Sequence, residues 1–195
     1  MNYLIKQKEI EILELELKIK KLELEILNDL DYEFFLPVEN YENYFISNFG
    51  NVKNNKTNKI MKQCNHRQGY KKIGLTKNGN RKMFLIHRLV ALAFLENPDN
   101  KPKVDHIDEN KANNNVKNLR WATVQENQSN QGKYKNNTSG FKGVSFNKPL
   151  NKYSAQIHIN YKKQHLGYYE TAEEGSRVYE KKAKEIHREF YYKNK

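Results

Sequence analysis

The stretch from Val104 to Asn130 places the strictest limits on what this 195-residue chain can fold into. An apolar–polar alternation ends at Asp105 and His106, an Asn-rich turn follows, and Leu119–Ala122 alternates again before a polar helical segment that carries Asn127. The pattern predicts a strand, a loop, a second strand and a helix. This order of elements is expected to bring Asp105 and Asn127 together, although they are far apart in the sequence.

The side chains that meet there have the chemistry of a hydrolytic metal centre. Asp105 and Asn127 carry oxygen atoms of the kind that Mg²⁺ prefers, and His106 carries a ring nitrogen that can take a proton from water. An Asp-His pair alone is more often an ordinary polar pair, but the whole constellation favours function. We therefore expect a divalent metal, Mg²⁺ or Mn²⁺, as the cofactor.

The motifs D-H-I-D, x-N-N, N-L-x-W and E-N, in this order, resemble the HNH endonucleases, the family with the ββα-metal fold. The resemblance implies that Asp105 and Asn127 hold one metal on the scissile phosphate and that His106 activates the attacking water. It also implies that Asn118 braces the loop that aims His106. Two positions depart from the family pattern: Glu109 replaces a frequent Gly, and Asn127 replaces the final His.

The charge of the chain predicts a polyanionic partner. The formal net charge is +12, and only 37% of the residues are hydrophobic, which favours small modules over one large core. Residues 1–30 carry five basic and seven acidic side chains, whereas residues 31–137 carry eighteen and ten, and residues 138–195 carry twelve and six. The excess of positive charge therefore lies after residue 30, and double-stranded DNA is the expected partner.

Cysteine usage and hydropathy exclude several classes of protein. Cys64 is the single cysteine, which rules out a disulfide framework and a zinc site built on several cysteines. The sequence has no apolar run of the length, about eighteen residues, that a membrane span needs. The Glu-rich N-terminus is unlike a signal or transit peptide, so the expected location is intracellular, in the cytoplasm or nucleus of the host.

The first thirty residues predict a coiled-coil helix. Ile5, Ile12, Ile19 and Ile26 recur every seven residues, and the content of Glu, Lys and Leu favours helix over strand. Leu15 and Leu22 occupy the d positions of this register, while a third apolar line is formed by Ile10, Leu17 and Leu24. We expect a homodimer through this helix. The alternative is a helix that folds onto its own domain.

Residues 31–68 are expected to form a separate small module. Short strands at about Tyr44–Ser47 and Asn51–Lys53 flank a turn in which Gly50 supplies a positive φ. The pattern Y-x-I-S-N-x-G-x-V resembles the nuclease-associated modular domain NUMOD4, which often precedes HNH motifs. In that family the module is associated with DNA recognition.

Residues 69–130 are expected to form the nuclease domain. A hairpin with its turn at Lys77–Asn80 precedes a helix at His87–Phe94, and H-R-L-V-A-x-A-F also resembles the segment before HNH motifs. Two interpretations of His87 and Arg88 stay open at this point. They either contact phosphate at the edge of the site or begin a structural helix.

A polar linker at residues 131–137 is expected to precede a C-terminal domain at residues 138–195. This domain should contain three strands, at about Gly143–Asn147, Tyr153–Ile159 and Lys163–Tyr168, and a helix over Thr171–Phe190. Thr171 is the expected N-cap of this helix, with Glu174 completing a capping box.

The motifs F-K-G-V, K-Y-x-A-x-I, L-G-x-Y and T-A-E-E in this domain resemble the AP2 DNA-binding domain, whose sheet lies in the major groove. The resemblance implies DNA contacts from the outward positions of the sheet. Those positions are Lys142, Ser145, Asn147, Lys152, Tyr153, Gln156, His158 and His165.

The sequence thus predicts an α+β protein, with a coiled-coil helix, a small sheet joined to a ββα-metal motif, and a three-stranded sheet packed on one helix. The predicted function is a site-specific DNA endonuclease of the homing or mobile-element type. One alternative is a catalytically inactive DNA-binding protein, such as a repressor. Another is an assembly protein built on the coiled coil.

Overall fold

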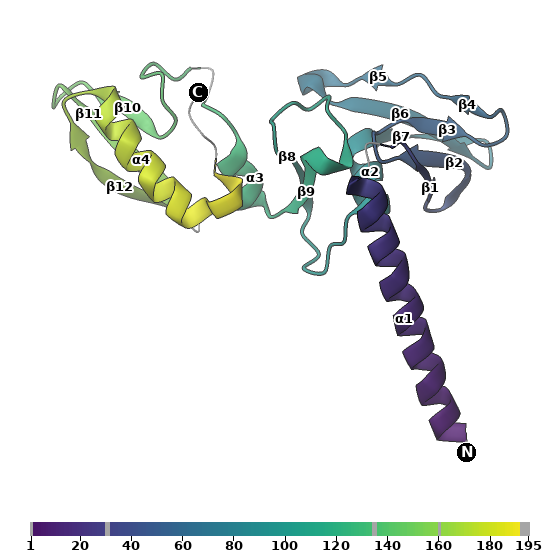
Figure 1. Ribbon diagram of the computed structural model, residues 1–195. Helices are drawn as coiled ribbons and strands as arrows, with labels where there is room; N and C mark the ends of the chain where they lie inside the picture. Colours follow the sequence, from purple (N-terminus) through teal and green to yellow (C-terminus); the bar gives the residue numbers. More distant parts are fainter. Residues whose placement is uncertain (1, 30–31, 134–135, 160, 192–195) are drawn as a thin grey trace. The chain divides into compact units, whose positions relative to one another are not determined.

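The computed structural model describes residues 2–29, 32–133, 136–159 and 161–191. The chain divides into two compact units (Figure 1). The N-terminal unit extends to Glu96 and includes Lys111–Leu119, and the C-terminal unit combines Asn97–Asn110 with the chain from Arg120 onward. The expected linker and the ends of the expected coiled coil and C-terminal domain fall partly on positions outside the described residues.

The elements follow one another in two groups. Those before residue 97 are α1 (Asn2–Asp29), β1 (Phe35–Val38), β2 (Tyr41–Ser47), β3 (Val52–Asn54), β4 (Lys59–Ile60), β5 (Cys64–Asn65), η1 (Arg67–Gly69), β6 (Lys71–Lys77), β7 (Asn80–Leu85) and α2 (Ile86–Phe94). Those after it are β8 (Lys103–His106), η2 (Val116–Asn118), β9 (Leu119–Ala122), α3 (Val124–Asn130), β10 (Val144–Asn147), β11 (Lys152–Ile159), β12 (Lys162–Tyr169), α4 (Ala172–His187) and η3 (Arg188–Phe190).

The helix expected at the N-terminus is confirmed as α1, and its apolar side chains face solvent. Every large apolar residue described from Ile5 to Ile26 is between 51% and 63% exposed. An apolar surface of this extent is typical of a helix that associates with another surface. None of the helices in the described ranges is both long and apolar enough to cross a membrane.

Two small antiparallel sheets form the body of the N-terminal unit. Their strand orders are β1-β2-β3-β4 and β5-β6-β7, and α2 packs against β1, β2, β6 and β7. The alternation of apolar residues in the strands buries Ile46, Ile73 and Leu75, and the helix adds Ile86 and Val90. The expected hairpin turn is confirmed between β6 and β7.

The turn between β2 and β3 joins the N-terminal sheet to the Asn-rich loop. Gly50 has φ +87°, and a Cβ there would lie 2.8 Å from Cβ of Asn114, so only glycine fits without a shift. The Asn48 carbonyl accepts a hydrogen bond from the Val116 backbone N–H at 2.7 Å. The loop before Asn118 is therefore held by backbone contacts of this turn.

The C-terminal unit contains the pair β8–β9 followed by α3, and the sheet β10-β11-β12 packed on α4. The expected three strands are confirmed within one residue at each end. The core between sheet and helix includes Val144, Ala155, Ile157 and Tyr179. The capping box of Thr171 and Glu174 is confirmed at the start of α4, which ends at His187 rather than Phe190.

Candidate active site

The side chains of Asp105 and His106 lie at the end of β8. Each is only 5% exposed, and Val104 before them is buried in the core. β8 pairs with β9, and α3 packs against β8. The strand, strand and helix expected from the sequence are thus confirmed, and the local fold places an acid and an imidazole next to each other in a mostly buried position.

A capping box fixes the start of α3. The Thr123 hydroxyl accepts from the Glu126 N–H at 3.1 Å, and the Glu126 carboxylate accepts from the Thr123 N–H at 2.6 Å. Lys101 Nζ lies 3.1 Å from the same carboxylate. This cap was not predicted, although the signature T-x-x-E at residues 123–126 is the same one that predicts the start of α4.

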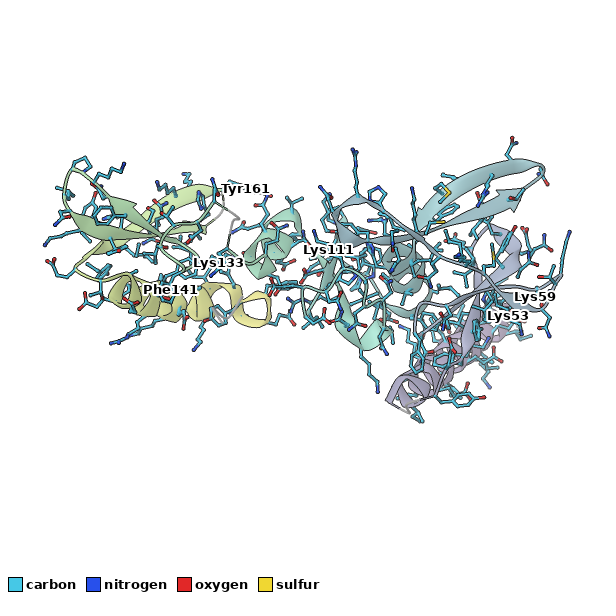
Figure 2. All side chains as sticks on the ribbon, turned by 90° about the horizontal axis from the view of Figure 1, so that it is seen from above. Lys53, Lys59, Lys111, Lys133, Phe141 and Tyr161 are labelled. Carbon is cyan, nitrogen blue, oxygen red and sulfur yellow. The ribbon has the colours of Figure 1, made fainter. Side chains whose placement is uncertain are left out.

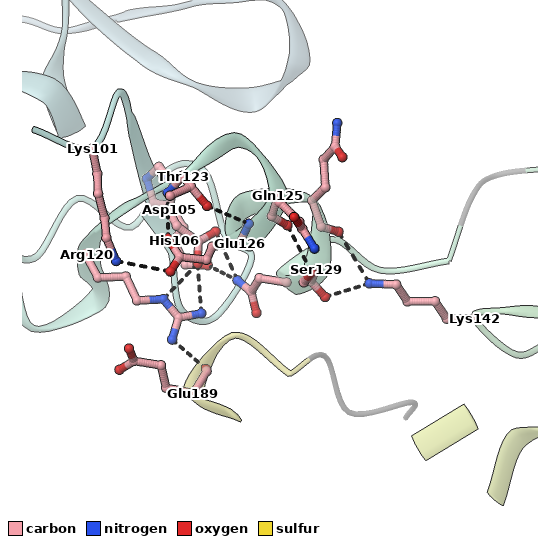
Figure 3. A network of polar contacts seen from close by, with 12 residues as sticks. Lys101, Asp105, His106, Arg120, Thr123, Gln125, Glu126, Ser129, Lys142 and Glu189 are labelled. Atoms are coloured by element: carbon pink, nitrogen blue, oxygen red, sulfur yellow. Dashed lines mark hydrogen bonds and ion pairs between the residues drawn. The ribbon is translucent and has the colours of Figure 1, made fainter. Parts of the chain in front are cut away.

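The Asp105 carboxylate is held by two side chains that the sequence analysis did not identify (Figure 3). Arg120 approaches Oδ2 with Nε at 2.9 Å and with Nη2 at 2.8 Å. Asn130 Nδ2 donates to Oδ1 at 3.1 Å and to the His106 carbonyl at 2.8 Å. Both carboxylate oxygens therefore have fixed donors, and Asn130 ties α3 to the Asp-His pair.

Burial and hydrogen bonding act in opposite directions on Asp105. Burial is the larger effect and raises the pKa of this carboxyl above its usual value, while the hydrogen bonds and charge of Arg120 and the hydrogen bond of Asn130 counteract it. The ion pair with Arg120 thus offsets part of the rise in pKa that burial causes.

Asn127 lies on α3 one turn before Asn130 and is half-buried. Its backbone N–H donates to the Thr123 carbonyl at 3.1 Å. Asn130, three residues further on the same helix, is the asparagine that contacts Asp105. Within the described ranges, no group of three or more His, Cys, Asp or Glu residues is arranged to hold a metal ion.

The turn after His106 has an unusual backbone at Glu109. Its N–H donates to the His106 carbonyl at 3.0 Å, and its φ is +64°. This is the left-handed region, which a residue with a Cβ enters at a cost of about 1–2 kcal/mol. The departure from glycine noted in the sequence thus falls on a position whose backbone favours glycine.

Asn118 belongs to the N-terminal unit, at the end of η2. It is buried, and its Nδ2 donates to the Asn113 carbonyl at 2.9 Å. Asn115 accepts from the Lys117 N–H at 2.9 Å as the N-cap of η2. These contacts of Asn115 and Asn118 are those of turn-forming residues, as expected for an Asn-rich turn.

His87 and Arg88 differ in exposure within the N-terminal unit. His87 is 5% exposed, and its ring lies 5.0 Å from that of Tyr70. This burial favours the structural interpretation of His87. Arg88 is half-buried and lines an apolar groove of about 1250 Å³ beside β1 and β7.

The candidate DNA contacts of the C-terminal sheet are placed by the alternation of its strands. Those found exposed or half-buried on the strands are Ser145, Asn147, Lys152, Tyr153, Gln156, His158 and His165. Lys152 forms an ion pair with Glu170 at 2.7 Å. Tyr161 in the β11–β12 turn is 73% exposed (Figure 2). On the N-terminal sheet, Lys59 is exposed and Lys53 is half-buried.

Tyr153 is also half-buried, but it lies on the other face of β11 from Lys152. Neighbouring residues of a strand point to opposite faces, so Lys152 and Tyr153 cannot both face outward. Tyr153 is in phase with the buried Ala155 on β11, and its ring lies 5.1 Å from that of its cross-strand partner Phe146. Its contacts are those of a packing residue.

The Lys142 ammonium group, also expected to face DNA, lies at the C-terminal end of α3. Nζ donates to the carbonyls of Ser129 and Gln131 at 2.6 and 2.5 Å, a position where the helix dipole favours a cation. Burial lowers the pKa of Lys142 to about 8, and the charge of Glu109 counteracts this shift. Lys142 thus joins the C-terminal sheet to α3.

Comparison with known proteins places two families on these elements. The family described as NUMOD4 motif matches residues 33–76, and the family described as HNH endonuclease matches residues 84–129. An uncharacterized HNH endonuclease of Acanthamoeba polyphaga mimivirus is 45% identical over 92 residues, which are 47% of this chain and 28% of that protein.

The DNA endonuclease I-HmuI of Bacillus phage SP01 is 43% identical over 95 residues, 48% of this chain and 55% of that protein. A solved structure entitled "DNA binding and cleavage by the HNH homing endonuclease I-HmuI" is 42% identical, with a TM-score of 0.48, over 50% of this chain and 57% of that one. The chain thus spans between 28% and 55% of the length of these two relatives. Residues 84–129, preceded by a segment that matches the NUMOD4 motif, thus match the HNH endonuclease family.

Proposed function

We propose that this protein is a site-specific DNA endonuclease of the homing or mobile-element type, which hydrolyses phosphodiester bonds in double-stranded DNA. One observation carries the proposal. Asp105 and His106 lie side by side at the buried end of β8, against α3, inside the segment that matches the HNH family. The charge of +12 supports a polyanionic substrate.

The donor atoms at this site fit a hard divalent cation. Asp105 Oδ2 faces Nε and Nη2 of Arg120, whereas Oδ1 accepts one hydrogen bond, from Asn130, and has a lone pair left for another bond. Mg²⁺ commonly binds one or two protein oxygens and completes its shell with water and phosphate oxygens. Asp105 and Asn127 are therefore the residues that would hold Mg²⁺ or Mn²⁺. When bound, the ion would stabilise negative charge on the phosphate and on the leaving oxygen.

The remaining chemistry belongs to side chains of the chain itself. His106 accepts a proton from the water that attacks phosphorus, and the new P–O bond forms as the bond to the 3′-oxygen breaks. The contact of Asn130 with the His106 carbonyl fixes the backbone of this residue. Asn118 is proposed to brace the loop that precedes β9.

The C-terminal domain is proposed to hold the DNA through an AP2-like sheet. The side chains of Ser145, His158 and His165 are exposed, and those of Asn147, Lys152 and Gln156 are half-buried. Asn and Gln suit adenine edges, while Lys and His suit phosphates. We therefore expect His158→Ala to weaken binding without changing the chemistry of cleavage.

The experiment that tests the function is cleavage of supercoiled DNA carrying the flanking locus of the gene, in Mg²⁺ or in EDTA. The wild-type chain is compared with His106→Ala, and with His66→Ala as the control for a histidine outside the site. We expect nicked or linear DNA from the wild type and from His66→Ala in Mg²⁺. We expect a loss of at least about 100-fold for His106→Ala, the scale typical of a general base.

Two other results would contradict either the assigned base or the nuclease activity itself. Cleavage that persists in His106→Ala would reject the assigned base. Salt-sensitive DNA binding without any metal-dependent cleavage would identify a catalytically inactive DNA-binding protein instead. Binding through six to ten phosphates should weaken by about a thousandfold or more between 50 and 200 mM salt.

A further inference from the structure

Arg120 connects the Asp105 carboxylate to the chain that follows α4 (Figure 3). Nε and Nη2 contact Asp105 Oδ2, while Nη1 donates to the carbonyl of Glu189. The guanidinium carbon lies 3.8 Å from the centroid of the Phe190 ring. Nε and Nη1 thus have hydrogen-bond acceptors, Nη2 lies within ion-pair distance of Asp105, and the flat group also packs on an aromatic face.

These contacts lie in a mostly buried environment. The side chains of Arg120 and Asp105 are 15% and 6% exposed, and Phe190 is 4% exposed. A cation on an aromatic ring is held more strongly when water is excluded. The guanidinium is a rigid planar fork, so it cannot turn away from Asp105 without also leaving Glu189 and Phe190.

The Phe190 ring is itself fixed from several directions. Arg188, at the end of α4, has φ +47° and turns the chain into η3, which packs against α3. Lys101 Nζ lies 5.6 Å from the Phe190 centroid and also pairs with Glu126 of α3. The Phe190 ring that packs on Arg120 is therefore held by the packing of η3, which follows α4, against α3.

We propose that Arg120 is a positioning residue of the nuclease centre, held by Glu189 and Phe190 so that it fixes the orientation of the Asp105 carboxylate. The inference rests on the proposed function. It gives the C-terminal segment a second role besides DNA binding, because residues 189–190 then set how well Asp105 binds a metal. Groups that orient a metal ligand in this way typically contribute 10- to 100-fold to metal affinity or activity.

The test uses two variants of the full chain, each with a single substitution. Phe190→Leu removes the aromatic face but keeps an apolar side chain. Arg120→Lys keeps the positive charge but removes the planar guanidinium group. Phe146→Leu, at a 43% exposed aromatic residue in the same unit, is the matched control. Urea unfolding in EDTA establishes that each variant is folded.

Three quantities are measured on these proteins. The first is the dissociation constant of Mn²⁺ without DNA, measured from the electron paramagnetic resonance of free Mn²⁺. The second is the Mn²⁺ concentration that gives half-maximal nicking, and the third is the nicking rate at saturating Mn²⁺. We expect the first two to rise about tenfold in Phe190→Leu and Arg120→Lys, with the saturated rate within about threefold of wild type. Phe146→Leu should match the wild type.

Proton exchange at the Arg120 Nε–H, measured by NMR without metal, gives a readout that does not depend on cleavage. We expect slow exchange in the wild type and fast exchange in Phe190→Leu. Unchanged exchange and unchanged Mn²⁺ affinity in a folded Phe190→Leu protein would overturn the positioning role alone. Tighter Mn²⁺ binding would overturn it too, since Arg120 would then compete with the metal. A wild-type chain that neither binds Mn²⁺ nor nicks DNA would overturn the proposed function and this role with it.

Discussion

The Arg120 guanidinium and the Asp105 carboxylate form a mostly buried ion pair, with Nε and Nη2 at 2.9 and 2.8 Å from Oδ2. Burial alone would favour the neutral acid, as the raised pKa of Asp105 indicates. The pair therefore offsets part of the cost of burying this carboxyl at the end of β8, and it makes the stability of the C-terminal unit depend on a residue proposed for catalysis.

Replacing Asp105 by Asn should destabilise the protein in the absence of metal. The arginine would lose its counter-charge, and breaking a buried pair from one side costs about 3 kcal/mol in the free energy of unfolding. Urea unfolding in EDTA measures this loss. Asp99→Asn, at an exposed position, is the control and should change stability by less than about 0.5 kcal/mol. Equal stabilities of Asp105→Asn and wild type would mean that the ion pair contributes little.

Glu109→Gly should stabilise the protein by about 1 kcal/mol, because glycine adopts a positive φ without the Cβ penalty. The φ of +64° at Glu109 is the basis of this prediction. Glu109→Ala removes the same charge but retains a Cβ, so it should give no such gain. The difference between the two variants in urea unfolding isolates the backbone effect, and a gain in both would assign it to the charge instead.

Lys142 should make stability depend on pH above neutrality. Burial lowers its pKa from 10.5 to about 8, so between these values the unfolded chain binds more protons than the folded one. The free energy of unfolding should therefore rise with pH across this window, and this contribution should be lost as pH falls to 8. Glu109 and His187 are the titratable neighbours that interact with this group.

The comparison that isolates Lys142 is the stability of the wild type minus that of Lys142→Met at each pH from 7 to 11. This difference should increase with pH, whereas the corresponding difference for the exposed Lys148→Met should stay flat. A flat profile for Lys142→Met would mean that the ammonium keeps an ordinary pKa at the end of α3.

Gly143→Ala should destabilise the C-terminal unit more than Gly140→Ala. Both glycines have positive φ, +75° and +83°, so both substitutions carry the strain of about 1–2 kcal/mol. At Gly143 a Cβ would also overlap the buried Tyr179 ring, whereas at Gly140 the described structure has nothing within 4 Å. Overpacking typically adds 1–3 kcal/mol. Equal losses in thermal unfolding would show that Tyr179 moves aside easily.

The exposed apolar surface of α1 should mediate a homodimer. Ile12 and Ile19 lie on the predicted heptad seam and are each 55% exposed. Sedimentation should therefore give twice the monomer mass of 23.2 kDa for the wild type. It should give the monomer mass for the double variant that carries both Ile12→Lys and Ile19→Lys. Leu17→Lys, on the third apolar line, should reduce association less. A monomeric wild type would contradict the coiled coil.

Local sequence was sufficient to predict most of the secondary structure. Hydrophobic alternation identified β9 and the three strands of the C-terminal sheet, and the T-x-x-E signature identified the start of α4. These features depend on neighbours within a few residues, so a pattern in the sequence encodes them directly. The same reasoning placed Asp105 and His106 together at the end of a strand.

The partners of those residues depended on the tertiary structure. Asn130 rather than Asn127 contacts Asp105, because the packing of α3 on β8 decides which turn of the helix faces the carboxylate. Phe190 reaches Arg120 across a long separation in sequence, and Lys142 contacts α3 instead of facing outward. The sequence by itself determined which chemical groups are present and which local elements carry them. Packing between distant elements decided which of those groups are buried, paired and aimed at one another.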